Sequence, residues 1–360
     1  MDSRADLALA PRTDPAALLL AWYDAHARSL PWRAPPGAPP MDAYRVWLSE
    51  VMLQQTTVAA VIPYFQRFTQ AWPDVLALAA APEEAVMAAW AGLGYYSRAR
   101  KLVECARVVA ANGGAFPQEE EALLALPGLG PYTAAAVAAI AFGRRAVVVD
   151  ANVERVVARY GAIGAPLPAA KPAIRAATDA LTPAERPGDF AQAMMDLGAS
   201  LCSVRAPKCL LCPLAGGCAA RAAGTAEAYP VKPPKKPKPQ RRGRAFWITR
   251  EGAAGAEVWL VRRPGRGLLG GMRALPDNGW NARADGAGPP PLAGPWQAGP
   301  SVAHVFTHFA LSLEVAFYSG KEAASLATGA GEWWPLARLD EAGLPSLFAR
   351  AAMAARAMRA

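Results

Sequence analysis

The stretch LPGLGPYTAAAVAAIAFG, residues 126–143, decides the fold of the first part of this chain. A preceding helix is predicted to end at Pro127, Gly128 and Gly130 allow positive φ, and an Ala-rich helix restarts after Pro131. This pattern is typical of a helix-hairpin-helix, whose tight turn presents successive backbone N–H groups beside a helix N-terminus. Such a turn can bind a phosphate of a nucleic acid without reading its sequence, although a plain connection between two packed helices has a similar pattern.

The composition around this stretch indicates two domains and a polyanionic partner. A chain of 360 residues exceeds what one small core needs, and 38 Lys and Arg against 29 Asp and Glu give a net charge of +9. From residue 15 to residue 224 apolar residues recur at helical spacing, which predicts a succession of helices. No apolar run reaches membrane-spanning length, so we expect a cytoplasmic protein with no membrane partner.

A basic, proline-rich segment supplies the domain boundary. The sequence PVKPPKKPKPQRRGR, residues 230–244, carries five prolines, which block both helices and sheet ladders. We therefore predict a helical domain over residues 1–228, an extended linker over 229–244 and a second domain over 245–360. The linker is solvated, and its basic side chains could also lie along phosphates.

Four cysteines within one short loop, residues 202–218, predict a metal site. Their spacing, C-x6-C-x2-C-x5-C, brings four thiolates together, whereas a disulfide framework would scatter its cysteines through a small secreted chain. Spacing alone leaves both zinc and an iron-sulfur cluster open. The cysteines are Cys202, Cys209, Cys212 and Cys218.

Glu50 is a candidate general acid. In the helical segment RVWLSEVMLQQTT, Val46, Glu50 and Leu53 fall on one face, which surrounds the carboxylate with apolar side chains. Burial raises the pKa of a carboxyl, so Glu50 could hold a proton near neutral pH. Alternatively, Glu50 lies at the edge of the apolar stripe and pairs with Arg45 or another basic residue.

Asp150 is a candidate second carboxyl. In VVVDANVERVVARYG it precedes a helical pattern and is a natural N-cap. It could also remain ionised beside the positive backbone dipoles and stabilise a developing cation. Two carboxyls whose environments push their pKa values apart suit the cleavage of a glycosidic bond.

With these elements in this order, the chain resembles the adenine DNA glycosylases of the MutY family, within the helix-hairpin-helix glycosylase superfamily. The matching motifs are LPWR at 30–33, VWLSEVMLQQT at 46–56, GLGYYSRAR at 92–100, LPGLGPYT at 126–133, VDANVERV at 149–156, QAMMDLGA at 192–199 and the four cysteines. The resemblance implies a mainly α helix-hairpin-helix glycosylase domain with an iron-sulfur cluster loop, and a smaller α/β Nudix-like C-terminal domain. It also implies that the cysteines hold a [4Fe-4S] cluster.

The resemblance implies an activity in base excision repair and assigns its catalytic residues. Members of the family flip an adenine mispaired with 8-oxoguanine or guanine out of double-stranded DNA and hydrolyse its N-glycosidic bond. Glu50 matches the acid that protonates adenine at N7, and Asp150 matches the carboxylate that stabilises the oxocarbenium ion, through a transient covalent adduct. Tyr132 and Asn152 match residues that orient this chemistry. Because strand-cutting relatives have a lysine at the position of Tyr132, we expect a monofunctional enzyme.

The resemblance also assigns binding residues. Trp32, Arg33 and Gln192 match the adenine pocket, Gln54 and Tyr95 match wedges inserted into the duplex, and Gly128 and Gly130 belong to the DNA-binding hairpin. Alternatively, Trp32 and Tyr95 are core aromatics. The stretch after LPWR, APPGAPPMDAY, is longer than is usual in the family, which puts in doubt how Arg33 reaches the pocket.

The second domain is predicted to contain strands at FWITR, EVWLVRRP and VAHVFTHFALSLEVAFY, then WWPLARL and a closing helix from Pro345. The resemblance implies recognition of 8-oxoguanine by Phe306, Thr307 and His308, where the family has Phe-Ser-His. A β-hairpin with a surface histidine would look similar. The glutamates are dispersed along the domain, so we do not expect Nudix hydrolysis.

Three other functions compete with this interpretation. A non-catalytic iron-sulfur DNA-binding protein would not need Glu50 or Asp150. A nucleotide pyrophosphatase would need a glutamate cluster, and a strand-cutting glycosylase would need the lysine. We expect a monomeric, nucleoid-associated bacterial protein.

Overall fold

The computed structural model describes residues 14–234, 237–253, 255–265, 267–318, 323, 326 and 331–358, and divides into two compact units. One unit comprises the chain up to Ala81 together with Arg100–Pro234, and the other comprises Pro82–Ala99 together with Lys235–Ala360. The predicted boundary placed residues 82–99 in the helical domain. Composition could not reveal this difference, because it does not show which unit a short helix packs against.

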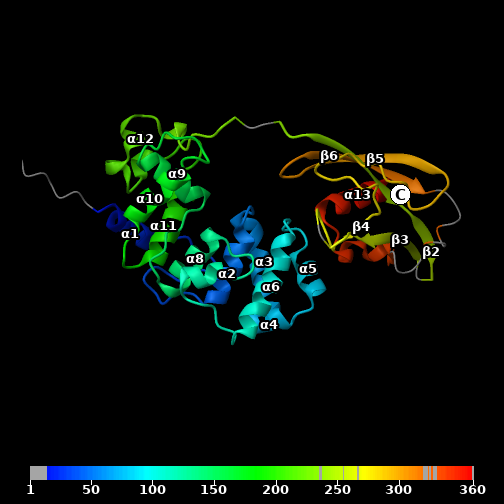
Figure 1. Ribbon diagram of the computed structural model, residues 1–360, viewed down its shortest axis with the longest axis horizontal. Helices are drawn as coiled ribbons and strands as arrows, with labels where there is room; N and C mark the ends of the chain where they lie inside the picture. Colours follow the sequence, from blue (N-terminus) through cyan, green and yellow to red (C-terminus); the bar gives the residue numbers. More distant parts are fainter. Residues whose placement is uncertain are drawn as a thin grey trace, which may run out of the picture. The chain divides into compact units, whose positions relative to one another are not determined.

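The chain before the linker is helical, as predicted (Figure 1). Its helices are α1 (Pro15–His26), α2 (Ala43–Leu53), α3 (Val58–Ala71), α4 (Val75–Ala80), α5 (Glu83–Trp90), α6 (Ser97–Ala111), α7 (Glu120–Leu124), α8 (Pro131–Phe142), α9 (Ala151–Tyr160), α10 (Lys171–Leu181), α11 (Pro187–Ser200) and α12 (Ala219–Ala222). Short 3-10 turns lie at Cys209–Leu211, Ala215–Gly217 and Ala226–Ala228. Side-chain oxygens cap several of the helix N-termini and so satisfy backbone donors that would otherwise lack partners. The capping residues are Asp14, Asp42, Thr57, Asp74 and Asp150.

The helix-hairpin-helix is formed by α7, the turn that follows it and α8. Gly128 has φ +81°, and a Cβ there would lie 2.7 Å from the Cβ of Lys101, so only glycine suits the position. Gly130 is the N-cap of α8 with φ −93°, so of the two glycines that allow positive φ only Gly128 adopts it. Residues 133–140 of α8 are buried, and their small side chains let α2, α7 and α11 pack against this helix.

The second unit contains two sheets and a helix. Its strands are β1 (Gln240–Trp247), β2 (Thr249–Gly252), β3 (Gly255–Arg262), β4 (Arg273–Ala274), β5 (Trp296–Val305), β6 (Ala310–Tyr318) and β7 (Glu332–Pro335), followed by the 3-10 turn η5 (Leu336–Ala342) and helix α13 (Ser346–Ala357). In one sheet β6 lies between parallel β1 and antiparallel β5. In the other, β3 pairs antiparallel with β2, β4 and β7.

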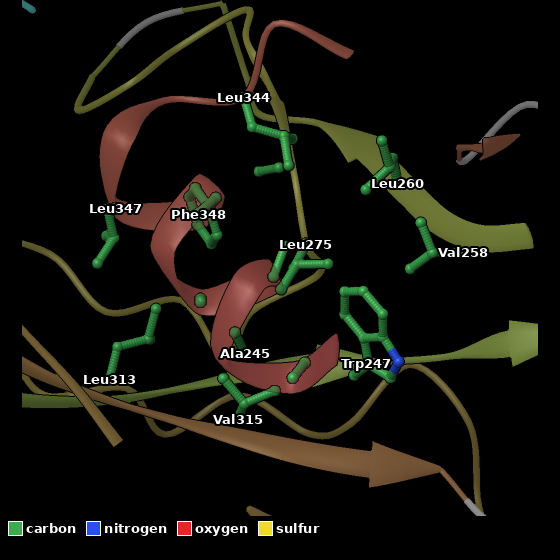
Figure 2. Close-up of a cluster of buried hydrophobic side chains, with 14 of the residues drawn as sticks. Ala245, Trp247, Val258, Leu260, Leu275, Leu313, Val315, Leu344, Leu347 and Phe348 are labelled. Atoms are coloured by element: carbon green, nitrogen blue, oxygen red, sulfur yellow. The ribbon is translucent and has the colours of Figure 1, made fainter. Parts of the chain in front are cut away.

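The core of this unit lies where both sheets meet α13. Figure 2 shows Phe348 of α13 among side chains of β1, β3 and β6, including Trp247, Val258 and Val315. These side chains are almost completely buried, and their shared removal from water stabilises the packing of helix on sheet. The strands and the closing helix agree with the sequence-based prediction.

The linker prediction was wrong at its C-terminal end. Residues 235–236 lie outside the described residues, but β1 begins at Gln240, so residues 240–244 form a strand rather than an extended spacer. No proline follows Pro239 in this segment, so its N–H groups are free to join the ladder with β6. Among the described helices, none is long and apolar enough to cross a membrane.

Candidate active site

One cleft of about 730 Å³ in the helical unit brings together most of the predicted site residues. Those that line it are Trp32, Arg33, Glu50, Gln54, Gly128, Gly130, Tyr132, Asp150 and Asn152. They come from the loop after α1, from α2, from the hairpin and α8, and from the start of α9. Gln192 does not line this cleft. It lines a second cavity of about 240 Å³, together with residues of the 34–41 loop.

Glu50 is buried in the wall of the cleft and is 5% exposed. The hydroxyl of Tyr132 donates a hydrogen bond of 2.5 Å to its Oε2, and Arg45 is not its partner. Burial raises the pKa of Glu50 to about 7, against the lowering effects of the Tyr132 hydrogen bond and the positive charge of Arg33, while the charge of Asp150 raises it further. At neutral pH a large fraction of Glu50 is therefore protonated, as the sequence-based argument predicted.

Asp150 is placed in the opposite kind of environment, at the N-terminus of α9. Its Oδ1 accepts hydrogen bonds from the backbone N–H groups of Asn152 and Val153, at 2.9 and 2.7 Å, and its Oδ2 accepts one of 2.8 Å from Asn152 Nδ2. These donors and the helix dipole stabilise the ionised carboxylate. Capping and a catalytic role are thus compatible, because the cap is what holds the charge in the cleft.

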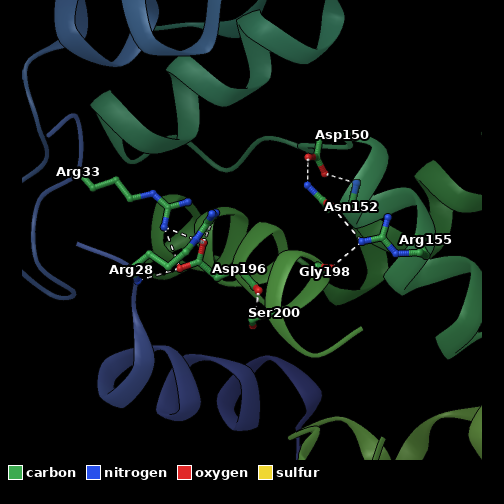
Figure 3. A network of polar contacts seen from close by, with 8 residues as sticks. All are labelled: Arg28, Arg33, Asp150, Asn152, Arg155, Asp196, Gly198 and Ser200. Atoms are coloured by element: carbon green, nitrogen blue, oxygen red, sulfur yellow. Dashed lines mark hydrogen bonds and ion pairs between the residues drawn. The ribbon is translucent and has the colours of Figure 1, made fainter. Parts of the chain in front are cut away.

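Asn152 belongs to a longer chain of hydrogen bonds that sequence reasoning missed (Figure 3). Arg155 donates to Asn152 Oδ1 at 3.0 Å, to the carbonyl of Gly198 at 2.6 Å and to the carbonyl of Cys202 at 2.8 Å. A Cβ on Gly198 would lie 2.6 Å from the Cβ of Asn152, so glycine allows α11 to pack directly against this part of α9. The orientation of Asp150 is therefore tied to the first cysteine of the loop.

Arg33 reaches the cleft despite the long loop that follows it. Its Nη1 donates to both carboxylate oxygens of Asp196 on α11, at 2.8 Å each, and Arg28 pairs with the same carboxylate (Figure 3). Arg28 and Asp196 were not predicted as site residues. The signal available in the sequence was an aspartate that follows the apolar residues Ala193 to Met195 and precedes Leu197. Trp32 both lines the cleft and packs edge-to-face on Phe65, at 5.2 Å between ring centroids.

The predicted wedges lie at the end of α2 and in the loop before α6. Gln54 is the C-cap of α2, and its Nε2 donates to Thr133 Oγ1 at 3.1 Å. Tyr95 is 44% exposed and adopts φ +49°, a conformation uncommon for a large side chain. The guanidinium of Arg98 lies 5.4 Å from the centroid of its ring. An exposed aromatic ring in a constrained turn differs from the core aromatic that was the alternative.

The four cysteines line one pocket, together with apolar residues of α9, α11 and the loop itself. Burial raises the pKa of Cys212 to about 11, and the three other thiols act in the same direction, as close neighbours do. The buried Arg159 donates to Cys202 Sγ at 3.3 Å and to the carbonyl oxygens of Cys202, Ser203, Val204 and Tyr229, which holds the start of the loop and ties it to the chain beyond the loop.

The four thiols supply donors that either zinc or an iron-sulfur cluster can use. A cluster uses a different iron atom for each cysteine, so it needs thiols around a common pocket but not in contact. The donor set, four thiols with a neighbouring arginine, is compatible with such a group.

In the second unit, Phe306, Thr307 and His308 form the turn between β5 and β6. Thr307 and His308 are exposed, whereas Phe306 stacks on Phe309 at 4.7 Å and lies 4.4 Å from the ring of His304. The turn therefore presents its polar side chains from an aromatic base.

The described glutamates of this unit do not form a metal site. Four of them are each paired with an arginine, namely Glu257 with Arg250, Glu314 with Arg244, Glu332 with Arg273 and Glu341 with Arg338. Glu322 lies outside the described residues. The expected dispersal of carboxylates is seen for the described glutamates.

Comparison with known proteins identifies both parts of the chain. Residues 48–180 match the HhH-GPD superfamily of base excision DNA repair proteins, and residues 245–354 match the NUDIX domain. A solved structure described as a thermostable thymine-DNA glycosylase is 30% identical, with a TM-score of 0.51, over 58% of this chain and 95% of that one. The match supports the helix-hairpin-helix fold of the first part.

Curated relatives extend the match over most of the chain. The human adenine DNA glycosylase is 38% identical over 82% of this chain and 65% of its own length, and the Arabidopsis and mouse enzymes are covered over 48% and 59% of theirs. The chain thus spans about half to two thirds of these longer relatives. The adenine DNA glycosylase of Mycobacterium tuberculosis is 42% identical over 68% of this chain and 77% of its own length. With two carboxyls in one cleft, a helix-hairpin-helix and this similarity, the chain belongs to the adenine DNA glycosylase family.

Proposed function

We propose that this protein is a monofunctional DNA glycosylase that removes adenine mispaired with 8-oxoguanine or guanine from double-stranded DNA. The observation that carries the proposal is the pair Glu50 and Asp150, which line one cleft in opposite environments. A buried, protonated acid beside an amide-stabilised carboxylate is the arrangement that cleavage of a glycosidic bond requires. That the base is adenine is inferred from the relatives, which are named adenine DNA glycosylases.

Glu50 is the general acid of the proposed reaction. Because Tyr132 donates its only hydroxyl proton to Oε2, the proton of the acid is carried on Oε1, which makes no hydrogen bond within the described chain. Transfer of that proton to N7 of a flipped adenine turns the base into a neutral leaving group. The C1′–N9 electron pair then leaves with the base, and positive charge develops on the sugar.

Asp150 stabilises that charge. Its carboxylate is held by two backbone donors and Asn152, so little reorganisation is needed when the cation forms. A transient bond from the carboxylate to C1′ is resolved by water, which leaves an abasic site. No lysine is among the residues that line the cleft, which supports hydrolysis rather than Schiff-base formation and strand cutting.

The second unit is proposed to recognise the base opposite the adenine. The exposed side chains of Thr307, whose hydroxyl lies 3.3 Å from the hydroxyl of Tyr95, and of His308 would contact 8-oxoguanine, and Phe306 anchors their turn in the unit. The hairpin turn at Gly128 and the basic chain around residues 238–244 are suited to phosphates. We propose that the protein acts on this DNA as a monomer at the nucleoid.

We propose that the cysteine loop holds a [4Fe-4S] cluster. When bound, the cluster would covalently cross-link the loop and so contribute folding free energy to it. Arg159 would orient Cys202, and Arg155 would connect that end of the loop to Asn152.

The function can be tested on a duplex that contains one adenine opposite 8-oxoguanine. Strand breaks are compared with and without hot alkali, for the wild type and for Asp150→Asn. Breaks that need alkali and disappear in the variant support the proposal. Breaks without alkali would indicate a lyase, and no base loss in any lane would favour a non-catalytic DNA-binding protein. A duplex with thymine opposite adenine is the control for mispair selectivity.

A further inference from the structure

Asp196 is a buried acid that touches two arginines of the cleft. It lies on α11 and is 1% exposed. Its Oδ2 accepts from the backbone N–H of Arg28 at 3.0 Å, its Oδ1 accepts from Arg28 Nε at 2.7 Å, and both oxygens accept from Arg33 Nη1 (Figure 3). A carboxylate with this many charge-assisted partners is held in one position.

The two arginines use Asp196 differently. Arg28 commits both Nε and Nη2 to the carboxylate and remains 34% exposed. Arg33 is only 6% exposed and commits Nη1 alone, and its Nε and Nη2 make no hydrogen bond to any described residue. Both arginines line the cleft that contains Glu50. Arg33 thus keeps donors for a ligand while one end of its guanidinium is fixed.

The group formed by Arg28, Arg33 and Asp196 also sets the charge next to Glu50. Two guanidiniums and one carboxylate leave a single positive charge, where the arginines alone would leave two. The charged and titratable groups that face Glu50 are Arg33 from the loop after α1, Tyr132 from α8 and Asp150 from the start of α9. Of these, Arg33 is the one whose position depends on Asp196.

We propose that Asp196 is a positioning residue for base removal, which fixes the guanidinium of Arg33 beside Glu50 and neutralises the excess positive charge of the Arg28–Arg33 pair. The proposal rests on the function proposed above for the cleft. Without the carboxylate, Arg33 would be free to turn towards Glu50 and would stabilise its ionised form. The acid would then lose its proton at lower pH, and the flipped base would meet an arginine in the wrong place.

The test compares Asp196→Asn, Asp196→Glu and the control Tyr23→Phe with the wild type. Tyr23 is buried beside Arg33 and Asp196, and its hydroxyl has no hydrogen-bond partner in the described chain. Removing this hydroxyl therefore changes no charge near Glu50. Three quantities are measured: binding of the mispaired duplex, the single-turnover rate of adenine loss, and titration of the Glu50 carboxyl by 13C NMR, with Glu50→Gln to assign its signal.

We expect Asp196→Asn to bind DNA like the wild type, to lose about a hundredfold in rate, as displaced reacting groups do, and to titrate Glu50 at lower pH. Asp196→Glu keeps the charge but moves Arg33, so it should show the wild-type titration and a smaller loss of rate. Tyr23→Phe should resemble the wild type in all three measurements.

Two results would overturn the inference. One is an unchanged Glu50 titration in Asp196→Asn, and the other, which holds even if that variant does not fold, is a wild-type rate in Asp196→Glu. Failure of the proposed function is separate, because it would appear as a wild type that removes no adenine. The titration of Glu50 needs no turnover and would still decide the role of Asp196.

Discussion

Glu50→Gln should make the protein more stable above neutral pH while it abolishes adenine removal. Burial raises the pKa of Glu50 from 4.5 to about 7 in the folded protein, and in the unfolded chain the carboxyl returns to its ordinary value. Between these two values the folded state holds a proton that the unfolded state has released, so the free energy of unfolding falls as pH rises through this window. The fall is complete above pH 7 and amounts to about 3 kcal/mol, at about 1.4 kcal/mol for each pKa unit.

Glutamine is neutral at every pH and nearly the same size, and it can still accept the hydrogen bond of Tyr132. The variant should therefore match the wild type near pH 4.5 and exceed it by about 3 kcal/mol near pH 8. Equilibrium unfolding in urea at the two pH values measures the difference.

Glu104→Gln is the matched control, because Glu104 is an exposed glutamate of the same unit, paired with Lys101. Its substitution should produce no gap that grows with pH. A gap of equal size at both pH values for Glu50→Gln would refute the reasoning, since it would mean that the stability change does not come from the buried charge.

Three further predictions concern the surroundings of this acid and the cysteine loop. Tyr132→Phe removes a hydrogen bond that lowers the pKa of Glu50, so the pH at which the single-turnover rate declines should rise by about one to two units. This shift corresponds to about 1.5–3 kcal/mol, the contribution of a hydrogen bond to a charged group. An unchanged pH profile would mean that Glu50 is not the acid. Arg159→Ala leaves several loop carbonyls without their hydrogen-bond donor, so the content of iron and sulfide per purified chain should fall below that of the wild type. A full iron content would show that the loop holds its cluster without this arginine. Gly198→Ala inserts a methyl group 2.6 Å from the Cβ of Asn152 and should cost about 1–3 kcal/mol in urea unfolding together with a slower cleavage step, whereas unchanged stability would mean that α11 shifts freely.

Several elements of the site were predictable because their signals are local. The turn at Gly128, the cap at Asp150 and the apolar face around Glu50 each depend on residues within a few positions of one another. The strands of the second unit were likewise predictable from alternating β-branched and aromatic residues. The error at the start of β1 arose where neighbouring structure, rather than local preference, decides the backbone conformation.

By itself, the sequence determined that the chain would form a helix-hairpin-helix unit with a cysteine loop, followed by a smaller unit of strands and a closing helix. Hydrophobic periodicity, glycine and proline positions and cysteine spacing act over short distances along the chain, and for that reason they can be read without coordinates. The tertiary structure alone decided which charges meet in the cleft. Arg28 and Arg33 meet Asp196 across separations of 168 and 163 residues, and Gln192 lines a different cavity from Glu50. Contacts of this kind depend on how helices pack, because the desolvation of a buried charge must be offset by a partner that only the folded chain brings near.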